Sequence, residues 1–291
     1  AKALAVPGLP PRPDLHMRMI EELVQTNPKP AQFEPVVADY LKKFPNRPDR
    51  FAAKVRLAQV FATAGDKAKA EQMIAEVLPV DARVHSAHSV YAQFFGTEPD
   101  ANVKKTRLAQ AEQTVRDAMA KSTPANAAAL RYTLALELLR DRAQDIPKAK
   151  AAARELAFAA PSNDGYTSGA INWLLDAAAD DAEFQADVAR LVEARKKFPW
   201  ISTYRGTLGG WSQPRLANKD LAKRAKFATD ELAKSDKDPA NVDWLALEKA
   251  AGQNNMSPQS ATARAKLLDP ARLAAVPDDV ANDLLYHQQH Y

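Results

Sequence analysis

The stretch RLAQVFATAGDKAKAEQMI, residues 56–74, decides the fold that this sequence predicts. Its apolar residues recur every three or four positions on both sides of Gly65-Asp66, which indicates two amphipathic helices. Glycine adopts the left-handed conformation that ends many helices, and an aspartate is favoured at the start of the next one. A turn this short joins two antiparallel helices in a helical hairpin. We expect similar turns at Asp145 and at Asp180.

The composition extends this prediction to the whole chain. Of the 291 residues, 46% are hydrophobic and 26% are charged, which is ordinary for a folded protein. Alanine and other strong helix formers dominate. Segments in which β-branched or aromatic residues alternate with polar ones, the signal of strands, are nearly absent. The sequence therefore predicts an all-α fold.

Several of the twenty prolines mark helix starts. Four of them follow a residue whose side chain can cap a helix, in the pairs Thr123-Pro124, Asp238-Pro239, Ser257-Pro258 and Asp269-Pro270. Proline suits the first helical position because it lacks the N–H group that could not be bonded there anyway. The helices are therefore expected to be many and short.

We expect an extended, proline-rich arm at residues 1–13, followed by consecutive helix pairs and a short last helix near residues 278–289. The expected pairs are 14–26 with 33–44, 49–64 with 66–78, 83–95 with 100–121, 125–142 with 146–160, 164–179 with 181–198, 201–212 with 218–235, and 240–251 with 258–268. Residues 14–291 would then form one helical-repeat domain, with a subdivision near residues 122 and 199 left open.

Residues 51–78 resemble a tetratricopeptide repeat. They carry, in the order of that family's motif, Leu57-Ala58, Phe61, Gly65, Ala70, Ile74 and Val77. Residues 128–161 and 165–199 carry less complete versions, and ADYLKKFPNRP at 38–48 is echoed by VEARKKFPWIS at 192–202. The resemblance covers about half of the chain. It implies a right-handed α-solenoid of about seven antiparallel helix pairs, with a concave groove that holds a protein or peptide.

The resemblance also implies that the first helix of each pair lines the groove. The groove residues would include Val55, Gln59, Tyr132, Asn172 and Tyr204. Aromatic residues gather in the fifth and sixth pairs, where Trp173, Trp200, Tyr204 and Trp211 lie close together in the sequence. Two interpretations stay open for them: packing residues of the core between repeats, or a binding hot spot, where aromatic residues are enriched.

Positive charge concentrates in residues 195–234, which hold ten Lys or Arg against three Asp or Glu, while the whole chain has a net charge of +4. Such a segment is either a solvated face or a surface that attracts an acidic partner. On the second hypothesis the partner would meet Arg195, Lys196, Lys197, Arg205 and Arg215 beside the aromatic residues. Nucleic acid is the least suited partner, because one mildly basic segment is not a continuous basic stripe.

Two histidine pairs have the spacing of one helical turn, His85 with His88 and His287 with His290. Such pairs can chelate a transition metal, but they are also common on helix surfaces. There is no HEXXH motif, and neither pair has an acidic residue four positions on. We therefore expect no metal site and no cofactor, with His287 and His290 as the weak metal candidates.

The glycine-rich stretch RGTLGGWS, residues 205–212, is not a phosphate-binding loop, because no strand precedes it and its glycines have the wrong order. It is better explained by close helix packing at Gly209 and Gly210, or by a bent helix leading to Pro214. No Gly-x-Ser-x-Gly motif is present, and no pair of carboxylates stands out from the helix surfaces.

The chain has no cysteine, which excludes disulfides, thiolate metal sites and cysteine nucleophiles. No apolar run approaches the roughly 20 residues that span a bilayer. The chain starts with alanine, and Ala3 and Ala5 form an A-x-A pattern like the end of a signal peptide. We expect an exported bacterial protein, periplasmic or secreted, with a trimmed cytoplasmic protein as the alternative.

These observations together favour a non-enzymatic scaffold that holds a protein or peptide in its groove. Two alternatives assign the chain to other classes of protein. One is an exported helical enzyme that acts on a glycan or a polyanionic substrate at residues 200–211. The other is a structural subunit of a cell-envelope assembly. The sequence does not determine the oligomeric state.

Overall fold

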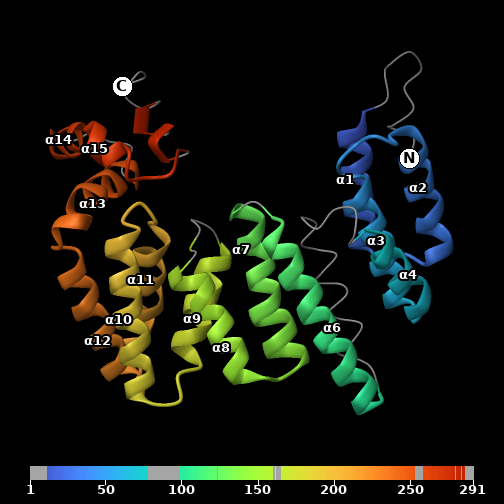
Figure 1. The fold of residues 1–291 in the computed structure, drawn as a ribbon, viewed down its shortest axis with the longest axis horizontal. Helices are drawn as coiled ribbons and strands as arrows, with labels where there is room; N and C mark the ends of the chain where they lie inside the picture. Colours follow the sequence, from blue (N-terminus) through green and yellow to red (C-terminus); the bar gives the residue numbers. More distant parts are fainter. Residues whose placement is uncertain are drawn as a thin grey trace. The chain divides into compact units, whose positions relative to one another are not determined.

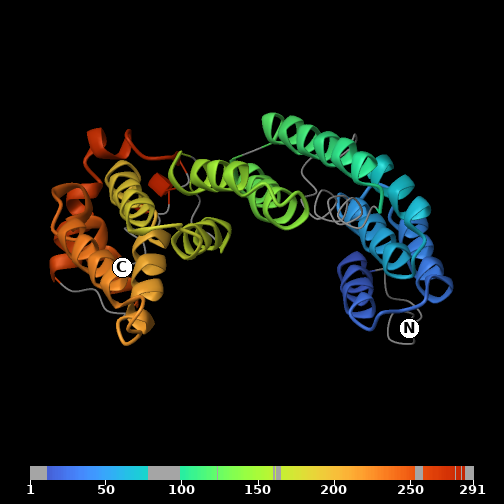
Figure 2. The ribbon, with the colours of Figure 1, turned by 90° about the horizontal axis from the view of Figure 1, so that it is seen from below.

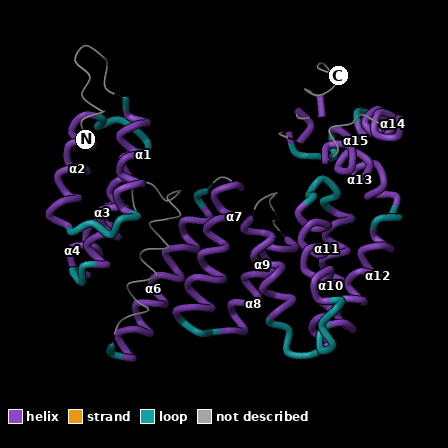
Figure 3. Tube along the Cα trace, turned by 180° about the vertical axis from the view of Figure 1, so that it is seen from behind, coloured by secondary structure: helices purple, strands orange, loops and turns teal. Residues whose placement is uncertain are grey.

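The computed structural model describes residues 12–77, 99–122, 124–159, 161, 165–252, 258–278, 280–282 and 284–285. In these residues every regular element is a helix and there is no strand (Figure 1, Figure 3), so the predicted all-α class is confirmed. The helices are α1 (Pro13–Val24), α2 (Pro30–Lys43), α3 (Arg50–Thr63), α4 (Lys67–Val77), α6 (Ala101–Ala120), α7 (Pro124–Tyr132), α8 (Ile146–Arg154), α9 (Gly165–Asp176), α10 (Asp181–Lys197), α11 (Thr203–Arg215), α12 (Ala222–Ser235), α13 (Pro239–Gly252), α14 (Pro258–Leu267) and α15 (Pro270–Leu273). Two segments are π-helical, η2 (Thr133–Arg142) and η3 (Glu155–Ala159).

The predicted proline starts are found in the structure. Helices α7, α13, α14 and α15 each begin at the proline of an expected cap–proline pair. The Asp238 carboxylate accepts a hydrogen bond from the Ala240 N–H at 3.0 Å, and Asp269 accepts one from the Ala271 N–H at 3.0 Å. These bonds satisfy N–H groups that have no partner within the first turn of a helix. The other two capping residues, Thr123 and Ser257, lie outside the described residues.

The Gly65 turn has the predicted conformation. Gly65 has a φ of +90°. Its N–H donates to the Ala62 carbonyl oxygen at 3.0 Å, and the Asp66 N–H donates to the Phe61 carbonyl oxygen at 2.9 Å. This pair of bonds is the Schellman motif, which closes a helix through a left-handed residue. Asp66 then caps α4 by accepting from the Lys69 N–H at 3.1 Å, so α3 ends and α4 begins within three residues.

The two other expected turns are also capped by aspartate. Asp145 accepts from the Lys148 N–H at 3.2 Å, directly after Gln144, which has a φ of +56°. Asp180 accepts from the Glu183 N–H at 2.8 Å, while the Glu183 carboxylate accepts from the Ala179 N–H at 2.7 Å. This reciprocal arrangement is close to a capping box.

The chain divides into two compact units, residues 1–153 and 154–291. In the first unit, α3 packs against α1, α2 and α4, and α6 packs against α7 and η2 (Figure 1). In the second unit, α9 packs against η3, α10 and α11, while α12 packs against α10 and α11 (Figure 2). Helix α13 packs against α14 and α10. Most of the proline-rich arm and the expected helix at 83–95 lie outside the described residues. The subdivisions near 122 and 199 stay predictions.

Candidate functional site

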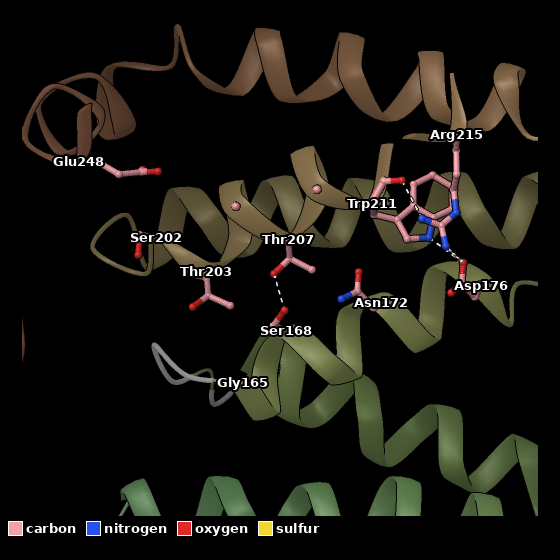
Figure 4. A pocket seen from close by; sticks show the side chains of 12 residues that line it. Gly165, Ser168, Asn172, Asp176, Ser202, Thr203, Thr207, Trp211, Arg215 and Glu248 are labelled. Carbon is pink, nitrogen blue, oxygen red and sulfur yellow. Dashed lines mark hydrogen bonds and ion pairs between the residues drawn. The ribbon is translucent and has the colours of Figure 1, made fainter. Parts of the chain in front are cut away.

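An open groove of about 970 Å³ lies in the second unit, along α9 and α11 (Figure 4). Its lining residues are Gly165, Ser168, Asn172 and Asp176 from α9, Ser202, which directly precedes α11, Thr203, Gly206, Thr207, Gly210, Trp211 and Arg215 from α11, and Glu248 from α13. Helices α9, α11 and α13 correspond to the first helices of the fifth, sixth and seventh expected pairs.

Regular spacing puts these side chains on one face of each helix. On α9 the spacing is Ser168, Asn172 and Asp176, and on α11 it is Thr203, Thr207, Trp211 and Arg215. Residues four apart lie one above the other on a helix. Helix α9 therefore turns a face of small and polar residues toward the groove, and α11 turns a face of glycines and threonines that ends in Trp211 and Arg215.

Hydroxyl and amide groups form the middle of the groove. The Thr207 hydroxyl donates to the Ser168 Oγ at 3.0 Å, which joins the two walls (Figure 4). Asn172 is half-buried, and its carboxamide has no hydrogen-bond partner among the residues that the structure describes. A free carboxamide offers two N–H donors and one carbonyl acceptor. The middle of the groove can therefore both donate hydrogen bonds to a ligand and accept them.

The charged groups at one end of the groove neutralise each other. Asp176 accepts from the Trp211 indole N–H at 2.7 Å and from Arg215 Nη2 at 3.0 Å. The Arg215 guanidinium also lies over the Trp211 ring, 4.6 Å from its centroid. A cation over the face of an indole is attracted by the negative face of the ring. Arg215 and Asp176 thus hold each other and leave no net charge at this end.

The opposite end is neutral for the same reason. Glu248 pairs with Arg205, whose Nη1 lies 3.4 Å from the carboxylate. The Arg205 Nε lies 3.4 Å from Asp236, and the Asp236 carboxylate also accepts from Arg195 Nη1 at 2.7 Å. Two cations and two carboxylates alternate in this chain of ion pairs. Arg195 is only 4% exposed, so its charge is not available to a partner.

The predicted ligand-binding residues are only partly brought together. Asn172 and Trp211 line the groove, and Arg205 supports its Glu248 end. Gln59 and Tyr132 are half-buried residues of the first unit, and they are not among the lining residues of this groove. Trp173 is half-buried on α9 and does not line the groove.

The aromatic residues of this region act mainly in packing, the first of the two interpretations of the sequence. Tyr204 is 0% exposed, and its hydroxyl donates to the Ala157 carbonyl oxygen at 2.8 Å. Burial raises the pKa of the Tyr204 phenol above its usual range. Trp211 is 3% exposed and packs against Phe184 at a ring-centroid distance of 5.1 Å. Trp200 packs against Trp244 of α13 at 6.2 Å.

Two groove residues expected from the repeat resemblance are corrected by their burial. Tyr204 and Val55 are both fully buried, so neither side chain can line a groove. The helical spacing places them on the first helix of a pair, as expected, but on its core face. The sequence alone did not separate the two faces, because both carry apolar and aromatic residues.

Most of the positive charge of residues 195–234 is compensated in the fold. Eight of its ten cations pair with carboxylates that lie mostly outside the segment: Arg195 with Asp236, Lys196 with Glu193 and Asp238, Arg205 with Asp236 and Glu248, Arg215 with Asp176, Lys223 and Arg224 with Asp181, Lys226 with Asp230, and Lys234 with Glu231. Lys197 instead lies over the Phe198 ring, and Lys219 is exposed. The local excess of charge that composition indicates is therefore largely balanced by carboxylates from other helices.

Close helix packing does not explain Gly209 and Gly210, so the first of the two expectations for them is wrong; the second, a bent helix leading to Pro214, stays a prediction. A Cβ added to Gly206 or Gly210 would meet no atom within 4 Å. A Cβ added to Gly209 would lie 3.8 Å from the Leu232 Cδ2, an ordinary contact. Gly206 and Gly210 instead face the groove, where they leave the helix backbone bare.

Both predicted histidine pairs lie outside the described residues. Within the part of the chain that the structure describes, no three His, Asp or Glu residues are grouped so that they could hold a metal ion. Among the same residues, no helix combines the length and the apolar character needed to cross a membrane.

A scan against models of protein families and searches of curated proteins and of solved structures found no match to this chain. The groove is therefore interpreted from its own geometry.

Proposed function

We propose that this chain is a non-enzymatic binding scaffold of helical repeats, which holds an extended segment of a partner protein in the groove along α9 and α11. The observation that carries the proposal is the groove itself: it is open to solvent, and its walls come from α9 and α11, which pack against each other. An enzyme site typically encloses its ligand in a deep pocket with convergent polar groups. An open groove between two helices suits an extended chain that lies along both of them.

The packing of the second unit supports the repeat part of this proposal. Helix α9 contacts α11, and α10 contacts α12. First helices thus pack on first helices, and second helices pack on second helices. Stacked hairpins of a tetratricopeptide-like α-solenoid have this arrangement. The proposal extends it to seven pairs along the chain.

The ligand is proposed to be a peptide because the groove walls suit a main chain. Gly206 and Gly210 allow a ligand to approach the backbone of α11 closely, since no Cβ stands in the way. On the α9 wall of the groove, the free carboxamide of Asn172 can donate to a peptide carbonyl and accept from a peptide N–H (Figure 4).

The experiment is a selection from a random dodecapeptide display library, followed by fluorescence anisotropy with the enriched peptides. Gly210→Leu places a large side chain on the groove wall, and its Cβ would meet no atom within 4 Å; circular dichroism melting shows whether the variant keeps the fold. Ala233→Leu on α12 is the matched control, since Ala233 is exposed and does not line the groove. We expect saturable binding that Gly210→Leu weakens by about tenfold or more, equivalent to 1.4 kcal/mol, and that Ala233→Leu leaves unchanged. Failure to enrich any peptide, or equal binding by both variants, contradicts the proposal.

A further inference from the structure

We infer that the segment bound in this groove is an uncharged, extended peptide of about five or six residues, and that its binding does not depend on salt. This inference rests on the proposed function and names the chemistry of its ligand. It replaces the acidic partner that the composition of residues 195–234 indicates.

The first step is the charge of the groove. Three charged residues line it, and each has an opposite partner: Asp176 and Arg215 pair with each other at 3.0 Å, and Glu248 pairs with Arg205 at 3.4 Å. A charged ligand side chain would meet charges that are already compensated, so the net electrostatic attraction is small. The Asp176 side chain is 52% exposed, so water screens this end of the groove further.

The second step is the chemistry of the remaining wall. Between the two ion pairs, the groove offers the Ser168 hydroxyl, which accepts from Thr207, and the carboxamide of Asn172. These groups are neutral, and they donate as well as accept hydrogen bonds. They match a peptide main chain and side chains such as those of Ser, Thr, Asn and Gln.

The third step is the length of the site. The wall formed by α11 runs from Thr203 to Arg215. At a rise of about 1.5 Å per residue this wall is about 18 Å long. An extended chain advances about 3.3 Å per residue, so about five or six ligand residues lie between the two ion pairs. An ion pair lies at each end of that span, Asp176 with Arg215 and Glu248 with Arg205, so neither end presents an unpaired charge.

The test uses three libraries of hexapeptides on one array: neutral polar, acidic, and basic, each flanked by the same glycine linkers. A fourth set on the array consists of neutral oligosaccharides. The best binder is synthesised, and its dissociation constant is measured at about 0.1 M and about 1 M NaCl, where the Debye length falls from about 10 Å to about 3 Å. We expect the neutral polar set to bind best, and its dissociation constant to change by less than about twofold between the two salt concentrations.

Variants separate the groove from other surfaces. Asn172→Ala is expected to weaken the neutral peptide severalfold, because the only free carboxamide among the described lining residues is lost. Lys196→Glu with Lys197→Glu lies outside the groove lining and is expected to leave binding unchanged. Circular dichroism melting of each variant shows whether the fold is kept.

The outcomes distinguish the two levels of the proposal. If acidic or basic peptides bind best, or if salt weakens binding severalfold, the inferred ligand chemistry is overturned while the peptide-binding function stands. If no peptide set binds, or if only oligosaccharides bind, the proposed function itself is overturned.

Discussion

Replacing Gly65 by alanine tests the turn from which the fold was predicted. The residue has a φ of +90°, in a region that residues with a Cβ rarely adopt. The two other described residues with positive φ, Asn27 and Gln144, have φ values of 49° and 56°, within the narrow left-handed region open to side chains. Alanine at position 65 is therefore strained even by comparison with these residues.

The expected magnitude follows from two opposing effects. A Cβ in the left-handed conformation costs about 1–2 kcal/mol. Alanine also restricts the unfolded chain, which returns about 0.4–1 kcal/mol. The net loss of unfolding free energy is about 1 kcal/mol. Because the φ of Gly65 exceeds that of the usual left-handed region, the loss is expected to be larger than this value. In a unit of about this size, 1 kcal/mol lowers the Tm by about 2–4 °C.

The assay is differential scanning calorimetry of the full chain, which can resolve the transitions of the two units. Gly206→Ala is the matched control: it is the same substitution at a helical glycine without positive φ and with no atom within 4 Å of the new Cβ. Alanine inside a helix is about 0.5–1 kcal/mol more favourable than glycine, so this control is expected to raise the Tm. Opposite signs for the two variants are the predicted result. A Tm that rises or stays constant in Gly65→Ala would refute a left-handed glycine at this turn.

Three further predictions concern side chains. Asp187 is 1% exposed, and its carboxylate accepts two hydrogen bonds from Arg154 at 2.8 and 2.9 Å. Asp187→Ala is therefore expected to lower the free energy of unfolding, measured in urea, by about 3 kcal/mol. A loss below about 0.5 kcal/mol contradicts this prediction. Burial and then Asp49 raise the pKa of Tyr40 to about 12. The pKa of Tyr40 in the folded protein lies above the usual value of about 10. Its contribution to the free energy of unfolding is therefore complete below pH 10 and is lost as the pH rises toward 12. Tyr40→Phe should not show this loss of unfolding free energy at high pH. If the free energy of unfolding falls with pH in the same way in both proteins, the prediction is refuted. Lys196→Glu with Lys197→Glu is expected to shift the Tm by less than about 2 °C, because both residues are exposed; a much larger shift would mean that these lysines stabilise the fold.

Local chemistry made much of the fold predictable. Gly65 ends a helix because of its own backbone freedom, and Asp238 and Asp269 start helices because their carboxylates bond to N–H groups two residues on. None of these effects depends on a distant residue. The positive φ of Gln144 was not predictable in the same way, because a glutamine does not favour that conformation.

The charge pattern was misleading for the opposite reason. Arg195 pairs with Asp236, and Arg215 pairs with Asp176, across about 40 residues of sequence. Counting charges within a window omits these partners, because they come from helices that approach only in the folded chain. Composition therefore left two interpretations open, a solvated face or a surface for an acidic partner, whereas the fold places most of these cations in ion pairs.

The groove could be predicted from the sequence only in part. Ser168, Asn172 and Asp176 recur every four residues on α9, and this spacing of small and polar residues is visible in the sequence. The glycines of residues 205–212 were visible too, but Gly209 and Gly210 were interpreted as a site of helix packing or as part of a bent helix. Only the positions of the neighbouring helices separate a glycine that faces another helix from one that faces a groove.

The most direct test of the proposed groove uses the absence of cysteine from the chain. Gly206→Cys introduces a single thiol on the groove wall, and Ala233→Cys introduces one on an exposed site outside it. The rate of alkylation by iodoacetamide is measured for both, with and without a saturating peptide from the selection. The account predicts that the peptide slows alkylation at position 206 by about tenfold or more, through burial of the thiol against solvent, and leaves position 233 unchanged. Equal rates at position 206 with and without the bound peptide would contradict binding in this groove.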